Sequence, residues 1–176
     1  MKRLAVLLAT MSLSVMWTGC GISYRAGLAP IPKELLKTDF TGKSTITLIN
    51  DYGEKASKIL IETTETNSYY GDLRQITGAS ITLLSEELTK RGMLVQANGD
   101  KMISLRVKNM FGDYQIGVFR TSIILSVAAA NGYSREFVET NSAWNYQSSF
   151  DGTISKVIAA VLNDENIVKY LIQGQK

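Results

Sequence analysis

Residues 118–144 form the stretch VFRTSIILSVAAANGYSREFVETNSAW, and this stretch decides the fold. β-Branched and apolar residues alternate with polar ones around Asn131-Gly132, a dipeptide typical of β-hairpin turns. A two-residue turn at this dipeptide places Leu125 opposite Val138. One face of the hairpin would then be directed at a core, and it would carry Phe119, Ile123, Leu125, Val138, Thr140 and Trp144. The opposite face would meet water and would carry Arg120, Ser122, Arg135, Glu139 and Asn141.

Outside this hairpin, the clearest element is a helix that follows Asp72. Asp72 is a favourable N-cap, and apolar residues recur at helical spacing as far as Lys90 or Arg91. Gly92 stands where a left-handed residue commonly ends a helix. Gly78 interrupts the helix, and we attribute it to close packing on a sheet.

Strands are predicted on both sides of that helix. Before it, the β-branched residues 44–49 predict a strand and residues 58–62 a shorter one, whereas residues 67–71 indicate a loop. After it, the alternating residues 103–107 predict a half-buried strand and residues 112–117 indicate another loop.

The C-terminal part has the pattern of a helix. Asp151 or Gly152 would begin it, and Asn163 or Asp164 would interrupt it and cap a final helix. Its apolar face is formed by Ile154, Val157, Ile158, Val161 and Leu162.

This order of elements favours an α+β fold. We expect a two-layer sandwich in which a mostly antiparallel sheet of roughly four to six strands is covered on one face by about two to three helices. The strand at residues 44–49 would join the sheet in parallel, by a right-handed crossover through the helix that follows Asp72.

The N-terminus has the pattern of a secretory signal. Lys2 and Arg3 precede the uncharged, largely apolar residues 4–17, a run too short to span a bilayer core, which takes roughly 20 apolar residues. Thr18-Gly19-Cys20 follows and resembles a bacterial lipobox, although Trp17 stands where lipoboxes usually have Leu. The resemblance implies cleavage between Gly19 and Cys20 and acyl chains on Cys20, the single cysteine of the chain.

Two alternatives to the lipobox stay open. One is an ordinary cleavage site that leaves Cys20 as a free thiol, and the other is an uncleaved N-terminal anchor. If Cys20 is acylated, Gly21 favours the outer membrane, because Asp commonly occupies that position in lipoproteins retained at the inner membrane.

These signals divide the chain into three parts. We expect residues 1–19 to be a lipoprotein signal peptide, residues 20–43 to be the lipidated N-terminus and a tether, and residues 44–176 to be a single α+β periplasmic domain. The tether has an open alternative, because some of its apolar residues could pack back on the domain, namely Leu28, Ile31, Leu35 and Leu36.

Composition excludes several classes of function. The chain has no histidine, which removes histidine-dependent triads and metal sites, and we predict no metal and no cofactor. Without Lys2 and Arg3, 17 basic residues face 16 acidic ones, so we predict no nucleic-acid partner.

The second half resembles the YajG-like lipoproteins of the bacterial outer membrane. The resemblance rests on residues 103–107, Tyr114-Gln115-Ile116-Gly117, residues 123–127, Asn131-Gly132 and the helix at 154–162, and it covers roughly residues 75–173. It implies a domain that is anchored in the outer membrane and faces the periplasm. The family offers no catalytic residue to transfer, and only Cys20 corresponds position by position.

Few side chains suggest catalysis. Ser155-Lys156 lacks the companion motifs of Ser–Lys enzymes and is expected on a solvated helix face, as are the acidic pairs Glu62 with Glu65 and Glu86 with Glu87. The aromatic residues near one end of the hairpin either fill the core or form a binding surface for sugars, lipids or peptides. These aromatic residues are Tyr69, Tyr70, Tyr114, Phe119, Trp144 and Tyr146.

We therefore expect a non-enzymatic binding or scaffolding module of the cell envelope, held at the membrane by acyl chains on Cys20. An envelope protein or peptidoglycan would be its partner, and its ligand-binding residues stay undetermined. The alternative is a carrier or assembly factor for a lipid or other apolar ligand, which requires a cavity between sheet and helices. An enzyme acting on envelope polymers would require two acids, or a Ser–Lys pair, in one cleft.

Overall fold

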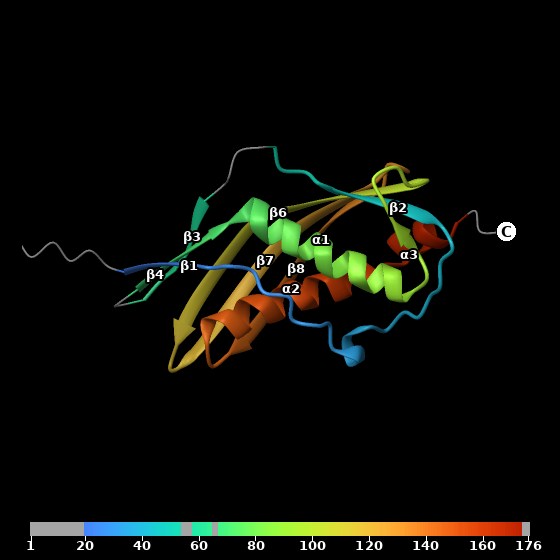
Figure 1. Ribbon diagram of the computed structural model, residues 1–176. Helices are drawn as coiled ribbons and strands as arrows, with labels where there is room; N and C mark the ends of the chain where they lie inside the picture. Colours follow the sequence, from blue (N-terminus) through green and yellow to red (C-terminus); the bar gives the residue numbers. More distant parts are fainter. Residues whose placement is uncertain (1–19, 54–57, 65–66, 174–176) are drawn as a thin grey trace, which may run out of the picture.

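The computed structural model describes residues 20–53, 58–64 and 67–173 and has two sheets and three α-helices (Figure 1). The five-stranded sheet has the strand order β5-β2-β6-β7-β8, and a three-stranded sheet has the order β1-β4-β3. The predicted α+β sandwich is confirmed. The elements are β1 (Cys20–Ser23), a 3-10 turn (Lys33–Leu35), β2 (Thr45–Asn50), β3 (Lys58–Thr63), β4 (Asn67–Asp72), α1 (Leu73–Lys90), β5 (Leu94–Val95), β6 (Lys101–Gln115), β7 (Val118–Ala129), β8 (Ser134–Ala143), α2 (Tyr146–Leu162) and α3 (Glu165–Ile172).

The larger sheet is mixed, and α1 and α2 lie across one of its faces (Figure 1). β2 pairs in parallel with both β5 and β6, and α1 connects it to them, as the sequence predicts for this strand. β6, β7 and β8 are antiparallel. The core between the sheet and the helices is formed by side chains such as Leu125 and Met110 from the strands and Phe150 and Val157 from α2.

The smaller sheet is absent from the predictions, because residues 67–71 form β4 and not a loop. β4 pairs with β1 in parallel and with β3 antiparallel. Tyr69 is buried, and a Cβ atom on Gly71 would lie only 2.6 Å from Ile61 Cδ1, so the close packing of this strand depends on other segments. Contacts between β4 and distant segments cannot be read from the residues of β4 alone.

Helix α1 follows its predicted limits. Asp72 caps it by accepting hydrogen bonds from the backbone N–H groups of Arg74 and Gln75. Gly92 has a φ of +83°, as expected for the residue that ends the helix. The explanation given for Gly78 is wrong, because the nearest atom to a Cβ built there is Asn50 Nδ2 at 3.8 Å, an ordinary contact.

Helix α2 starts earlier than predicted. It begins at Tyr146, and Asn145 caps it by accepting from the N–H of Ser148 at 2.8 Å. Its first turns carry few apolar residues, chiefly the buried Phe150, and their polar residues Ser149 and Thr153 are buried as well, since both are hydrogen-bonded to Thr121 of β7. The predicted final helix is confirmed as α3, with Asp164 as its N-cap.

The predicted register of the β7–β8 hairpin is wrong by one residue. Leu125 pairs with Phe137 and not with Val138, because the loop has three residues, Ala130 to Gly132, and the N–H of Ala129 donates to the carbonyl of Tyr133. A shift of one residue exchanges the two faces of β8. Phe137 is therefore buried, whereas Val138 and Trp144, both predicted to face the core, are 61% and 81% exposed.

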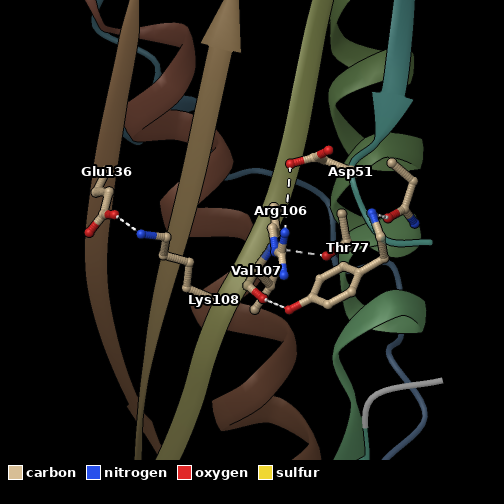
Figure 2. A network of polar contacts seen from close by, with 8 residues as sticks. Asp51, Thr77, Arg106, Val107, Lys108 and Glu136 are labelled. Carbon is tan, nitrogen blue, oxygen red and sulfur yellow. Dashed lines mark hydrogen bonds and ion pairs between the residues drawn. The ribbon is translucent and has the colours of Figure 1, made fainter. Parts of the chain in front are cut away.

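β6 is longer than predicted, since residues 112–115 continue the strand to a two-residue turn at Ile116-Gly117. A β-bulge between Val107 and Asn109 changes which residues face inward. Figure 2 shows how the bulge is held: the N–H of Val107 donates to Thr77 of α1 at 3.0 Å, and the Val107 carbonyl accepts from the Tyr52 hydroxyl.

Residues 20–43 pack on the domain, so the tether interpretation is wrong; of the residues named for its alternative, Ile31, Leu35 and Leu36 pack on the core, whereas Leu28 is 48% exposed. Tyr24, Ile31 and Phe40 belong to the core. Asp151 of α2, which the sequence suggested as a helix start, instead accepts from the Tyr24 hydroxyl at 2.6 Å and from the N–H of Gly27 at 2.9 Å. Burial and this hydrogen bond raise the pKa of Tyr24 well above its ordinary value, so the hydroxyl stays a donor.

Candidate functional site

A hollow of about 590 Å³ lies along the free edge of β8, and we call it the β8–α2 groove. One side is β8 itself, and the C-terminal half of α2 and the segment after the 3-10 turn complete it. Its lining residues are Leu35, Lys37, Arg135, Glu136, Phe137, Val138, Glu139, Lys156, Ala159, Ala160, Asn163 and Asp164. Six of these twelve residues are charged, so the groove suits a polar chain with a few apolar groups better than a purely apolar ligand.

The backbone of β8 presents hydrogen-bonding groups to this groove. Because Ala129 and Tyr133 form a hydrogen-bonded pair, the odd-numbered residues of β8 bond to β7, and the even-numbered ones direct their N–H and C=O groups outward. Lys156 confirms this direction, since its Nζ donates to the outward carbonyl of Thr140 at 3.0 Å. Within the described part of the chain, the outward backbone N–H and C=O groups of Glu136 and Val138 have no hydrogen-bond partner.

One wall of the groove is fixed by hydrogen bonds from Asn163. Its Nδ2 donates to the Leu35 carbonyl at 2.7 Å, and its Oδ1 accepts from the backbone N–H groups of Lys37 and Thr38 at 2.9 and 3.1 Å. The N-terminal segment is therefore held against the end of α2. The opposite wall, β8, is also held in place, because Lys108 of β6 forms an ion pair with Glu136 of β8 across β7 (Figure 2).

The end of the groove is closed by a polar cluster around Asp164. Arg135 Nη1 donates to Asp164 Oδ2 at 2.7 Å and the Tyr133 hydroxyl donates to the same oxygen at 2.9 Å, while Oδ1 caps α3. Burial by itself raises the pKa of Asp164, but the hydrogen bond from the Ile167 N–H and those from Arg135 and Tyr133 outweigh it and leave the pKa below 3.8. The aspartate therefore stays charged and bound.

The structure separates the side chains that were considered for catalysis. Ser155 is buried, contrary to prediction, and its hydroxyl donates to the Ala29 carbonyl at 2.7 Å, whereas Lys156 points to β8. Glu87 is also buried and pairs with Lys90 at 2.5 Å, so only Glu86 matches the predicted solvated pair. Nothing is described for the side chains of Glu62 and Glu65.

The lipobox is described only in part. Gly19 lies outside the described residues, and Cys20 is the first residue of β1, where its backbone pairs with Asn67. In the described ranges, no three His, Cys, Asp or Glu side chains are grouped to hold a metal ion. No helix of the same ranges is long and apolar enough to cross a membrane.

The predicted aromatic residues form one cluster and one exposed tip. Phe119 stacks near Tyr114 at 4.6 Å between ring centroids, and Tyr69 and Tyr146 connect it to the core. Trp144 and Tyr70 lie outside the cluster, because Trp144 is mostly exposed beside the Ile116-Gly117 turn and the Tyr70 ring has Lys58 Nζ 4.6 Å from its centroid. None of these side chains lines the β8–α2 groove.

The sequence did not reveal this groove, and the reason is the register error. Because Val138 was placed in the core, the sequence could not show which backbone groups of β8 point outward, or that Phe137 lines the groove. The signal that could have found them is the apolar pair Phe137-Val138, which allows either residue to face inward.

Comparisons with known proteins assign neither a family nor a function. No family model matches the sequence, and no curated protein does. Among solved structures, the chain is similar to protein XCC0632 from Xanthomonas campestris, of the family DUF330, at 11% identity and a TM-score of 0.49, over 88% of this chain and 96% of that one. A likeness this distant supports no functional argument, and the resemblance to the YajG-like lipoproteins stays a prediction.

Proposed function

We propose that this chain is a lipoprotein of the bacterial outer membrane, anchored through acyl chains on Cys20, whose periplasmic domain is a non-enzymatic module that binds an extended segment of another envelope protein. The binding part of the proposal rests on one observation, the outward backbone of β8 at Glu136 and Val138. An unpaired strand edge is a template for strand addition, in which main-chain hydrogen bonds supply affinity and neighbouring side chains supply specificity.

The groove determines which segment fits. A strand added beside Glu136 and Val138 would exchange hydrogen bonds with their N–H and C=O groups. Ala159 and Ala160 would accept a small apolar side chain, and Lys37 would attract an acidic one. Because both walls are tied in place, the site is preorganised, which reduces the entropy lost on binding.

The anchoring part of the proposal is supported by the sequence of the first twenty residues. Two or more acyl chains hold a protein firmly at a membrane, whereas one chain binds only marginally. Mass spectrometry of the mature chain from its native membrane tests this part. We expect an N-terminus at Cys20 that carries acyl chains, and an unmodified or uncleaved N-terminus would overturn it.

The binding part is tested by photo-crosslinking in cells. A photoreactive amino acid at Lys37, which lines the groove, is expected to give a discrete adduct with one envelope protein, and the same group at the exposed Lys33 is the matched control. An adduct with peptidoglycan, or with a second copy of this chain, would contradict the proposed partner.

A pair of substitutions at Val138 tests strand addition itself. Val138→Pro removes an outward N–H and adds a ring at an edge position, while the bonds from neighbouring residues to β7 remain. Val138→Ala is the control, because it changes the side chain and keeps the N–H. We expect the Lys37 adduct to be lost in V138P and kept in V138A, with both variants folded by circular dichroism. Equal adducts in both would exclude strand addition.

A further inference from the structure

A patch of apolar side chains projects from the tip of the β6–β7 hairpin. This hairpin-tip patch consists of Tyr114, Ile116 and Trp144, whose exposed fractions are 46%, 99% and 81%. Trp144 lies next to the turn, since its Cζ3 atom would be 3.9 Å from a Cβ on Gly117. The cluster below the patch is also aromatic, so a rigid base supports the exposed groups.

Ile116 is a poor choice for this turn on folding grounds. Gln115 pairs with Val118, and both central residues have positive φ, +49° at Ile116 and +79° at Gly117. Turns of this kind favour Asn, Asp or Gly, and a β-branched residue in the left-handed region is strained. The turn therefore gives up stability to place an apolar side chain in full exposure, which points to an apolar environment for it in the working protein.

The turn between β6 and β7 lies at the same end of the molecule as the start of β1, whose first residue is Cys20 (Figure 1). Ile22 of β1 pairs with Tyr69, and the Tyr69 ring contacts Phe119, which is two residues beyond the Gly117 turn. From Ile22, the chain continues inward to Tyr24, which packs on α2, so Cys20 is the outer end of this strand. Two residues of strand separate Cys20 from Ile22, about 7 Å at a rise of about 3.3 Å per residue.

The position of Cys20 also limits how far the domain can stand from a membrane. β1 starts at Cys20 itself, and the residues that follow it pack on the domain. Acyl chains on Cys20 would therefore hold the folded domain directly at the bilayer surface, with this end facing the lipid.

We propose that the hairpin-tip patch inserts into the lipid headgroup layer of the membrane that holds Cys20, as a second contact that orients the domain. Trp and Tyr are enriched at membrane interfaces, where their rings are part apolar and part polar. Two exposed arginines suit anionic headgroups: Arg120, which pairs with Asp113 near the β6–β7 turn, and Arg25, whose carbonyl accepts from Gln147 at the start of α2. This inference rests on the anchoring part of the proposed function.

Trp144 provides a direct readout, because it is the only tryptophan from residue 20 onward. The acylated chain is reconstituted in vesicles of phosphatidylethanolamine and phosphatidylglycerol, and its fluorescence is recorded. We expect a shift of emission to shorter wavelength and loss of most of the emission when the lipids are brominated near the ester end of their acyl chains. Emission identical to that of the free chain in buffer would overturn the proposal.

A second preparation separates this proposal from the anchoring itself. Residues 20–176 are coupled through Cys20, the only thiol, to a maleimide lipid in the same vesicles, so the domain is held at the surface whether or not cells acylate it. Quenching of Trp144 here supports the membrane contact even if native Cys20 proves unmodified, and its absence overturns the contact even if native Cys20 is acylated. Ile116→Asn, which suits the left-handed turn, is expected to weaken the quenching without unfolding the domain.

Discussion

The two turns that join β6, β7 and β8 lie at opposite ends of β7 and are built for different purposes. At the Ala130–Gly132 loop, the Asn131 side chain accepts from the Tyr133 N–H, Gly132 takes the positive φ, and Asp164 ties the strand below to α3. At the other turn, Ile116 takes a positive φ and stays fully exposed. The first end is arranged for stability, whereas the second sacrifices stability for exposed apolar surface. Such a difference within one sheet is a sign of function at the less stable end.

The largest expected effect is at the stable end. Asp164→Ala removes the cap of α3 and the acceptor of Arg135 and Tyr133, and we expect the free energy of unfolding to fall by about 2–3 kcal/mol in urea denaturation. Asp164→Asn keeps a capping oxygen and loses the charge, so its loss should be smaller. Equal stability of the wild type and both variants would remove the contrast between the two ends.

The pH dependence of stability tests the contribution of the charged Asp164 side chain separately. The pKa of Asp164 is lower in the folded chain than its ordinary 3.8, so its contribution is complete above about 3.8 and is lost as the pH falls through the lower folded value. The difference in unfolding free energy between wild type and D164N should therefore be constant near neutral pH and shrink in acid. A difference that grows in acid would contradict this assignment.

A smaller effect of opposite sign is expected at the exposed turn. Ile116→Asn relieves a left-handed β-branched residue, so the free energy of unfolding should rise by about 1 kcal/mol. Thermal denaturation of residues 20–176 in buffer measures it. A loss of stability would mean that Ile116 serves the fold, and it would weaken the argument for a surface role.

The smallest effect serves as a control outside both turns. Gly78→Ala places a methyl group on α1 within ordinary contact distance of Asn50, and replacing a mid-helix glycine should raise the free energy of unfolding by about 0.5–1 kcal/mol. Its Trp144 quenching on vesicles should match that of the wild type. Reduced quenching in G78A would show that the vesicle assay follows stability and not the patch.

Elements with local signals were predictable from the chain. Asp72 and Gly92 mark the ends of α1 through their own side chain and backbone preferences, and Asp164 marks the start of α3 in the same way. The lipobox pattern at Cys20 is equally local, and it remains a prediction. The candidate groove was not predictable, because it required knowing that Phe137 and not Val138 faces the helices.

The sequence by itself determined the α+β class, the parallel entry of β2 and most element limits, since hydrophobic period, caps and turn residues act over a few neighbours. Only the tertiary structure decided the register of β8, the existence of β4 and the packing of residues 20–43 on the domain. Each of these depends on contacts between distant segments, such as Tyr24 with Asp151, whose free energies no local pattern contains.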